Sequence, residues 1–210
     1  MTIELRNLKP RYMSESEVSG SDIYLQPSLC FEQGRKYMIC ARSGHGKTSL
    51  LNFIYGINKS FDGEIVLTEN EERRTENELH TRVLSFMFQD LCLFPELTAM
   101  ENVQLKNRLT NFKSDTEIEQ MLDALLPQGK KHQLVASLSL GQRQRVAAVR
   151  ALCQPFAFLL LDEPFSHLDH DTAAKVATMI NDEVEKQGAG LIVTALDAID
   201  FFPFDVTFNL

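Results

Sequence analysis

The sequence predicts an α/β fold with a mostly parallel central sheet, and three neighbouring segments predict it. Residues 156–161 and 191–194 are short runs that are almost wholly apolar, as in strands buried on both faces of a sheet. Residues 171–186, between them, place apolar side chains at helical spacing and end before Gly188. A strand, a helix and a strand in this order are typical of a parallel sheet covered by helices.

The first part of the chain predicts further strands around one helix. Residues 3–8 alternate apolar and polar side chains, and Gln33-Gly34 predicts a turn between two strands. Polar residues 11–20 indicate a loop, and the charged residues 69–78 indicate an exposed connection. The expected strands are 3–8, 21–31, 35–40, 64–67 and 83–88, and the expected helix is 47–57, ended by Gly56.

Residues 98–137 change to a helical pattern and predict an insertion in the α/β core. Ser114 and Glu117 have capping-box spacing before an apolar stripe that Pro127 and Gly129 end. A second helix begins near Ser139. We therefore expect one domain over residues 1–210, with a core of residues 1–90 and 140–210, a small antiparallel β subdomain, and a helical subdomain at about 91–139. The stripe consists of Ile118, Met121, Leu122 and Leu125.

The composition is that of an ordinary acidic globular protein. The 210 residues are 44% hydrophobic and 24% charged, with a net charge of −8 and a pI of about 5.2. An acidic chain is a poor ligand for nucleic acid or for an anionic membrane surface, because both attract clustered Lys and Arg. We expect no nucleic-acid partner, and any phosphate binding must be local.

Cysteines and hydropathy predict a cytoplasmic protein. The four cysteines form no C-x-x-C pair and predict buried free thiols in a reducing compartment. No apolar run approaches the ~18 residues of a membrane span, and the first ten residues lack the apolar stretch of a signal peptide. If the protein serves a membrane, another polypeptide must span it. The cysteines are Cys30, Cys40, Cys92 and Cys153.

A glycine-rich loop follows the strand expected at 35–40 and has the spacing of a phosphate loop. Glycines let backbone amides turn toward phosphate oxygens, and the following helix adds its positive amino end. Lys47 is placed to reach the β- and γ-phosphates of a nucleotide, and the Thr48 hydroxyl to bind Mg²⁺. The alternative is a plain glycine-rich turn before a helix. The loop is Ala41, Arg42, Ser43, Gly44, His45, Gly46, Lys47, Thr48 and Ser49.

Two carboxylates follow the apolar run that ends at Leu161. Asp162 is placed to hold Mg²⁺ directly or through water, and Glu163 to orient or deprotonate a water that attacks the γ-phosphate. An acidic turn after a core strand is the alternative. Behind a phosphate loop, the pair predicts a nucleotide-hydrolysing P-loop NTPase.

A third motif makes the family recognisable. Residues 138–145 (LSLGQRQR) resemble the signature motif of ATP-binding cassette (ABC) ATPases, the subunits that power ABC transporters. Residues 88–90 (FQD) resemble their Q-loop, and residues 166–169 (SHLD) their D-loop. Residues 93–103 are similar to members of the lipoprotein-releasing and macrolide-exporter type. The resemblance covers nearly the whole chain, with the motifs in the right order.

The resemblance implies two cassettes packed head to tail around two ATP molecules, as a homodimer or a heterodimer. The signature residues of each cassette would meet the ATP of the other, and the D-loop aspartate would belong to the nucleotide-binding residues. Gln89 would bind Mg²⁺ and report the nucleotide state, and Tyr12 would stack on adenine. A plain strand end, a surface tyrosine and an ordinary capped helix remain the alternatives. The signature residues expected across the interface are Ser139, Gly141 and Gln142, and the D-loop aspartate is Asp169.

The resemblance also implies transmembrane permease subunits as partners. The cassette would lie on the cytoplasmic face of the cell membrane and touch the membrane only through them. ATP would close the dimer, and hydrolysis would open it. Family members that act on DNA or ribosomes usually carry a long coiled-coil insertion or a second cassette, and this sequence has neither.

Two positions depart from the family pattern. Leu140 replaces the first glycine of the signature, and Ala195 replaces a histidine that contacts the γ-phosphate. The last histidine in the chain is His170, so no neighbour in the sequence offers a substitute. Loss of one donor to a transition state typically costs ~10²–10³ in rate. The sequence therefore predicts a slow ATPase, with a degenerate cassette that binds ATP and scarcely hydrolyses it as the alternative.

Overall fold

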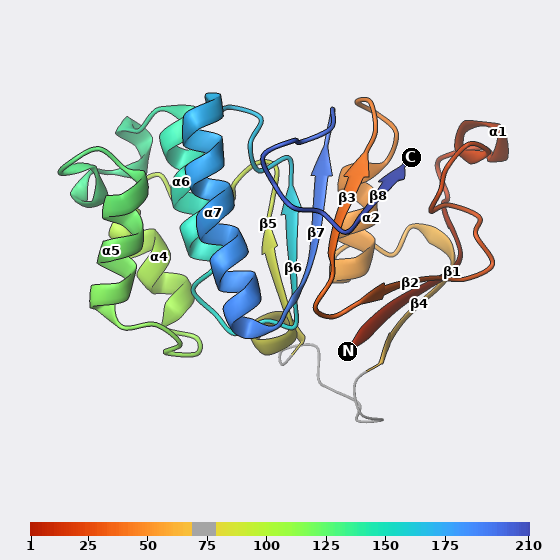
Figure 1. Cartoon of the computed structure of the whole chain (residues 1–210), viewed down its shortest axis with the longest axis horizontal. Coiled ribbons are helices and arrows are strands. Elements are labelled where there is room, and N and C mark those ends of the chain that lie inside the picture. The colour runs from red at the N-terminus through yellow and green to blue at the C-terminus, as the bar shows by residue number, and fades with distance from the viewer. Residues whose placement is uncertain (69–78) are drawn as a thin grey trace.

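The computed structural model describes residues 1–68 and 79–210, and a parallel five-stranded sheet forms its centre (Figure 1). The strand order is β5-β6-β7-β3-β8, and every neighbouring pair is parallel. The predicted α/β fold is therefore confirmed. The strands are β3 (Lys36–Cys40), β5 (Leu84–Met87), β6 (Phe158–Asp162), β7 (Gly190–Ala195) and β8 (Val206–Asn209).

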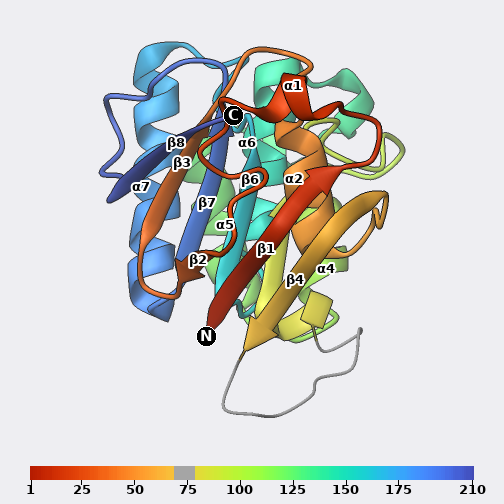
Figure 2. The ribbon, with the colours of Figure 1, turned by 90° about the vertical axis from the view of Figure 1, so that its right-hand side faces the viewer.

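A smaller antiparallel sheet of order β2-β1-β4 packs beside the parallel sheet (Figure 2). Alternation along β1 buries Ile3 and Leu5 completely or nearly so, while Thr2 and Glu4 are half-buried. The buried side chains of β1 share one hydrophobic cluster with those of the first long helix, α2. The elements are β1 (Thr2–Pro10), β2 (Leu29–Glu32), β4 (Phe61–Thr68) and α2 (Lys47–Tyr55).

Two helices pack on the face of the parallel sheet opposite α2, two more lie beside them, and the starts at Ser114 and Ser139 follow the expected caps. Ser114 and Ser139 each form a capping box with the residue three positions on, as does Thr98. The helices are α4 (Ala99–Asn107), α5 (Asp115–Leu125), α6 (Leu140–Ala151) and α7 (His170–Gln187). The described residues also include a π-helical turn (Leu79–Val83) and two 3₁₀ turns (Lys130–His132 and Val135–Ser137).

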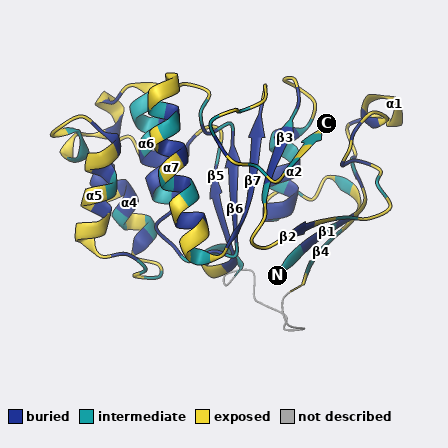
Figure 3. Cartoon of the chain, viewed as in Figure 1, coloured by how far each residue is buried: buried dark blue, intermediate teal, exposed yellow. Residues whose placement is uncertain are grey.

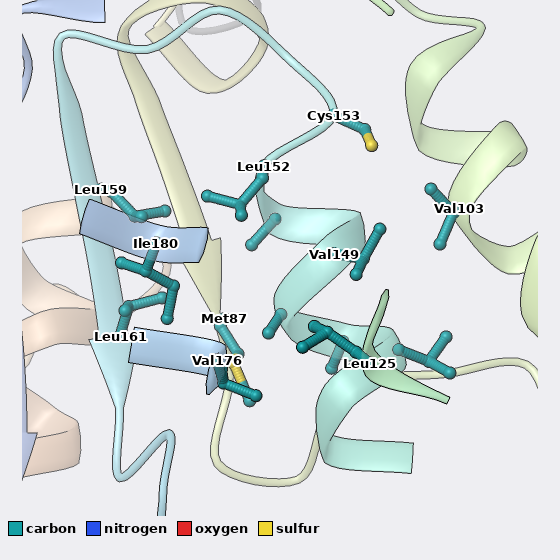
Figure 4. Close-up of a cluster of buried hydrophobic side chains, with 14 of the residues drawn as sticks. Met87, Val103, Leu125, Val149, Leu152, Cys153, Leu159, Leu161, Val176 and Ile180 are labelled. Carbon is teal, nitrogen blue, oxygen red and sulfur yellow. The ribbon is translucent and has the colours of Figure 1, made fainter. Parts of the chain in front are cut away.

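The period of two along β6 divides the core between the two faces of the sheet. Leu159 and Leu161 point into the cluster formed with α6 and α7 (Figure 4), while Phe158 and Leu160 point into the cluster with α2. All four are fully buried, and Figure 3 shows the central strands buried along their length. Burial of each such side chain contributes roughly 1.5–3 kcal/mol relative to exposure. The strand end that carries Asp162 is therefore held rigidly.

The expected strand over residues 21–31 is wrong, because only Leu29–Glu32 pairs with β1. The Ser21 hydroxyl accepts hydrogen bonds from the backbone N–H groups of Ile23 (3.0 Å) and Tyr24 (2.8 Å), and this local turn replaces the ladder of a sheet. Leu25 then takes a positive φ of 60°. The apolar side chains suggested a strand, but Ile23 and Tyr24 join the core beside α2, and the Tyr24 hydroxyl contacts Gly46.

Other expectations also differ from the structure. The polar loop at 11–20 contains a one-turn helix, α1 (Glu15–Val18), which Ser14 and Glu17 cap. Strand β8 was not predicted. The expectation of buried thiols holds for Cys153, whereas Cys30 and Cys92 are exposed and Cys40 is half-buried; all four are free.

The sequence also predicted an exposed connection and no membrane-spanning segment. The connection expected at residues 69–78 lies outside the described residues. Among the helices that the structure describes, none combines the length and apolar character that crossing a bilayer requires.

Candidate functional site

The glycine-rich loop joins the end of β3 to the start of α2, and two of its glycines have left-handed backbones. Gly44 has φ +84° and Gly46 has φ +88°. A Cβ on Gly46 would lie 2.9 Å from the hydroxyl oxygen of Tyr24, which donates a hydrogen bond to the Gly46 carbonyl (2.9 Å). No side chain caps α2. The first amides of this helix are therefore available to an anion.

Lys47 begins α2, and its ammonium group is buried among oxygens. Lys47 Nζ donates to the carbonyl oxygens of Ala41 (2.6 Å) and Arg42 (3.1 Å), and it lies 3.4 Å from Glu163 Oε1. The lysine side chain is only 4% exposed. A buried cation requires such partners. The predicted lysine and the predicted carboxylate thus meet at one point.

A cavity of about 410 Å³ opens between the loop and its surroundings. The Thr48 hydroxyl donates to Gln89 Oε1 (3.1 Å), and the Tyr12 hydroxyl to Ser49 Oγ (2.5 Å). Tyr12 is 58% exposed, so its ring remains accessible to a planar ligand. The nine lining residues are Tyr12, Ser43, Gly44, Gly46, Lys47, Thr48, Ser49, Gln89 and Glu163, all of them predicted site residues.

The two carboxylates after β6 have different environments. Asp162 is buried; its Oδ1 accepts a hydrogen bond from Thr194 Oγ1 (2.5 Å), and its Oδ2 has no partner among the described residues. Glu163 lines the cavity and has a φ of +48°, a conformation that residues other than glycine rarely adopt. A buried carboxylate oxygen without a partner, together with hydroxyl and amide oxygens such as those of Thr48 and Gln89, is a donor set that fits Mg²⁺.

The predicted signature residues lie at the start of α6, outside this cavity. Ser139 Oγ accepts from Gln142 N (3.3 Å), and Gln142 Oε1 accepts from Ser139 N (3.0 Å). A Cβ on Gly141 would lie 2.8 Å from the His167 carbonyl oxygen. Glycine at this position therefore lets α6 pack closely against the loop that follows Glu163.

The Gln144 side chain joins the same helix to that loop, and Gln144 was not among the predicted site residues. Its Nε2 donates to the Glu163 carbonyl (3.0 Å), and its Oε1 accepts from His167 N (3.2 Å). The side chain is buried. Its position three residues after Gly141, on the same helix face, is the signal that identifies it.

The remaining predicted residues have local roles. Asp169 caps α7, because its Oδ1 accepts from Thr172 N (2.9 Å); this bond holds the pKa of Asp169 below its usual value. His45 Nδ1 lies 3.2 Å from the Ser43 carbonyl oxygen. Ala41 and Arg42 contribute carbonyl groups to Lys47 rather than lining the cavity.

Ala195, at the end of β7, lines a second cavity of about 420 Å³ together with Glu163. The Ala195 carbonyl accepts from Ala41 N (3.2 Å), which joins the strand end to the phosphate loop. His170 lines the same cavity, although the sequence offered no neighbour as a substitute donor. Its ring packs edge-on against Phe201, with 5.4 Å between the ring centroids.

The segment after Gln89 is strained and is held by the far end of α6. Leu91 (φ 64°) and Cys92 (φ 45°) are consecutive left-handed residues. The guanidinium of Arg150 donates to both of their carbonyl oxygens, at 2.5 and 2.6 Å. Helix α6 therefore contacts the loop after Glu163 near one end and the segment after Gln89 at the other.

Comparisons with known proteins agree with this geometry. A family model described as ABC transporter matches residues 24–166. The chain is 38% identical to the thiamine import ATP-binding protein ThiQ of Histophilus somni, over 85% of this chain and 87% of that protein. It is 34% identical to the lipoprotein-releasing system ATP-binding protein LolD of Saccharophagus degradans, over 82% of this chain and 78% of that protein.

Solved structures of ABC transporter cassettes also resemble this chain. The dimeric structure of MJ0796, described as a bacterial ABC transporter cassette, superposes with a TM-score of 0.75 and 27% identity, over 93% of this chain and 88% of that one. A second structure of the same cassette, with ADP and Pi, is described as a post-hydrolysis state and has a TM-score of 0.74, 26% identity and the same coverage.

Proposed function

Because the chain belongs to the ABC transporter family and is an ATP-hydrolysing transporter subunit, we propose that the 410 Å³ cavity holds the triphosphate of MgATP. The meeting of Lys47, Glu163 and the uncapped start of α2 in this cavity is the observation that carries the proposal. Amides of the loop bind the phosphate oxygens, and Lys47 neutralises their charge. The exposed Tyr12 ring covers the base.

Three residues supply oxygens for the metal: Thr48, Gln89 and Asp162. When bound, Mg²⁺ offsets the negative charge that develops on the phosphates during transfer. The unpaired Oδ2 of Asp162 supports its part in this set. Glu163 acts on the attacking water as the orienting or basic group. Because Ala195 offers no hydrogen-bond donor, hydrolysis is slow.

A second cassette completes the site. Ser139, with an exposed side chain at the amino end of α6, lies outside the cavity of its own subunit. We propose that Ser139, Gly141 and Gln142, together with Asp169, meet the ATP of the partner cassette. The dimer known for MJ0796 supports this arrangement.

The helical subdomain, at about residues 91–139, carries the contact with the permease. A groove of about 310 Å³ near Gln89 exposes Phe94, Leu105 and Leu109, which are 51%, 43% and 62% exposed. Exposed apolar side chains gathered at a groove favour a protein partner. We propose permease subunits of the lipoprotein-releasing type as that partner, which places the cassette on the cytoplasmic face of the membrane.

Calorimetry and turnover test the proposal. Wild-type protein is expected to bind MgATP and to hydrolyse it, Lys47→Ala to lose binding, and Glu163→Gln to bind MgATP while its turnover falls to background. A protein without heat of MgATP binding would refute the nucleotide site. Equal turnover in wild type and Glu163→Gln, alone and with permease, would favour a cassette that only binds ATP.

A further inference from the structure

Thr194 lies at the carboxyl end of β7, beside both carboxylates assigned above. In the parallel register, Thr194 is the direct partner of Asp162 on β6. Alternation places Asp162 on the same face as Phe158 and Leu160, and Thr194 on the same face as Ile192, toward α2. Thr194 is fully buried. The fold therefore fixes the hydroxyl group next to the site.

The hydroxyl makes two hydrogen bonds with different partners. Its proton goes to Asp162 Oδ1 (2.5 Å), and its oxygen accepts from the backbone N–H of Glu163 (3.2 Å), which also donates to the Thr194 carbonyl (3.1 Å). A hydroxyl has one proton and two lone pairs, so both bonds form together. One group thus orients the Asp162 carboxylate and supports the left-handed backbone of Glu163.

The orientation decides which oxygen of Asp162 is available. Because Oδ1 is occupied by the hydroxyl, Oδ2 is the atom that has no partner among the described residues. The next residue on β7, Ala195, offers only a methyl group. Thr194 is therefore the last side chain of β7 (Gly190–Ala195) that can donate a hydrogen bond at this edge of the sheet.

We propose that Thr194 is a positioning residue for ATP hydrolysis. It aims Asp162 Oδ2 toward the metal and holds the backbone from which Glu163 reaches the γ-phosphate, and it touches neither ligand itself. The inference rests on the proposed function, because it assigns Thr194 a role only through Asp162 and Glu163.

Turnover of three proteins gives the first test. Thr194→Val removes the hydroxyl and keeps the branched shape, so kcat is expected to fall about 10- to 100-fold, as for loss of a hydrogen bond to a charged group. KM for MgATP is expected to rise only as far as the Mg²⁺-dependent part of the affinity is lost, because the phosphate loop is not altered. Thr194→Ser retains the hydroxyl and restores most of kcat. If Thr194→Val does not fold, Thr194→Ala replaces it.

Affinity gives a second readout that does not depend on turnover. Calorimetry with ATP, with and without Mg²⁺, is done on Glu163→Gln protein so that no ATP is consumed. Adding Thr194→Val is expected to leave the affinity for metal-free ATP unchanged and to reduce the gain in affinity that Mg²⁺ provides. Adding Thr194→Ser instead preserves that gain.

Ser85→Ala is the matched control. Ser85 is fully buried on β5 of the same sheet, and its hydroxyl donates to the Ala151 carbonyl (2.6 Å), away from the carboxylates. The Ser85→Ala variant is expected to have a lower melting temperature and an unchanged kcat. A Thr194→Val protein with wild-type kcat and wild-type Mg²⁺ dependence overturns the inference, as does an equal loss of kcat in Ser85→Ala or a failure of serine to restore it.

The two proposals fail in distinguishable ways. Wild-type turnover that Glu163→Gln abolishes, combined with an unaffected Thr194→Val, refutes only the positioning role. Absence of both MgATP binding and Glu163-dependent turnover in wild type refutes the proposed function, and the positioning role with it.

Discussion

A buried ion pair joins the segment between α4 and α5 to α7. Its burial determines how much stability the protein loses when one partner is removed. Lys113 Nζ lies 2.8 Å from Glu183 Oε2, and the two side chains are only 4% and 9% exposed. The Asn107 side chain holds the backbone of Lys113 through two hydrogen bonds, of 2.7 and 2.9 Å. Gln187 donates to the other oxygen of Glu183 (2.8 Å). The pair is therefore fixed from both sides.

Lys113→Met leaves the Glu183 carboxylate buried without its cation. Breaking a buried pair in this way costs about 3–5 kcal/mol. For a chain of this size, 1 kcal/mol corresponds to a shift of about 2–4 °C in Tm, so Tm is expected to fall by roughly 6–20 °C. The double variant Lys113→Met/Glu183→Leu removes both charges, and its Tm is expected to recover much of the loss. Scanning calorimetry measures all three proteins.

Lys131→Met is the matched control, because Lys131 pairs with Glu119 and Asp123, whose side chains are 48% and 56% exposed. Exposed pairs contribute little, so its Tm should change far less. A Lys113→Met protein whose Tm falls no further than that of Lys131→Met would refute the argument from burial. A double variant less stable than Lys113→Met would refute the argument that the isolated charge is the cause.

Ala195→His places a donor beside the 420 Å³ cavity, and kcat is expected to rise about 100-fold; steady-state turnover within twofold of wild type would contradict this. Gly141→Ala pushes a Cβ against the His167 carbonyl and should lower stability to urea by about 1–3 kcal/mol, whereas Gly20→Ala, with no atom within 4 Å of the added Cβ, should not; equal effects would be the contrary result. Burial raises the pKa of the Cys153 thiol to about 12, above its ordinary value of 9.0. The unfolded chain therefore loses its proton first, and stability falls as the pH rises from 9 toward 12; Cys153→Ala should flatten this dependence in urea titrations, and an unchanged slope would contradict the assignment.

The parts of the fold that depend on local pattern were predictable from the sequence. The apolar runs gave β6 and β7, and the serine caps gave the starts of α5 and α6. The Ser21 turn was not predictable from apolar pattern alone, because one hydroxyl satisfies the amides that a strand would have paired. Strand β8 is short and half-buried, so its pattern is weak.

The sequence predicted which residues meet at the cavity, but it did not predict the hydrogen bonds that support them. The motifs predicted Lys47 and Glu163 as site residues, and the structure brings the two together at one cavity. The bonds of Thr194 and Gln144 depend on the register of β6 with β7 and on the packing of α6, which join residues far apart in sequence. A local pattern can place Gln144 on the helix face of Gly141, but it does not contain the partners of these bonds.

Helix α6 is about 18 Å long, at 1.5 Å for each of its twelve residues. Arg150 joins its carboxyl end to the carbonyl groups of Leu91 and Cys92, and a helix of this length does not shorten under load. A displacement of its amino end that moves the helix as a rigid body therefore also moves Arg150 and the two left-handed residues that it holds. The stretch beside Gln89 can thus respond to an event three helical turns away without any change in the secondary structure between them.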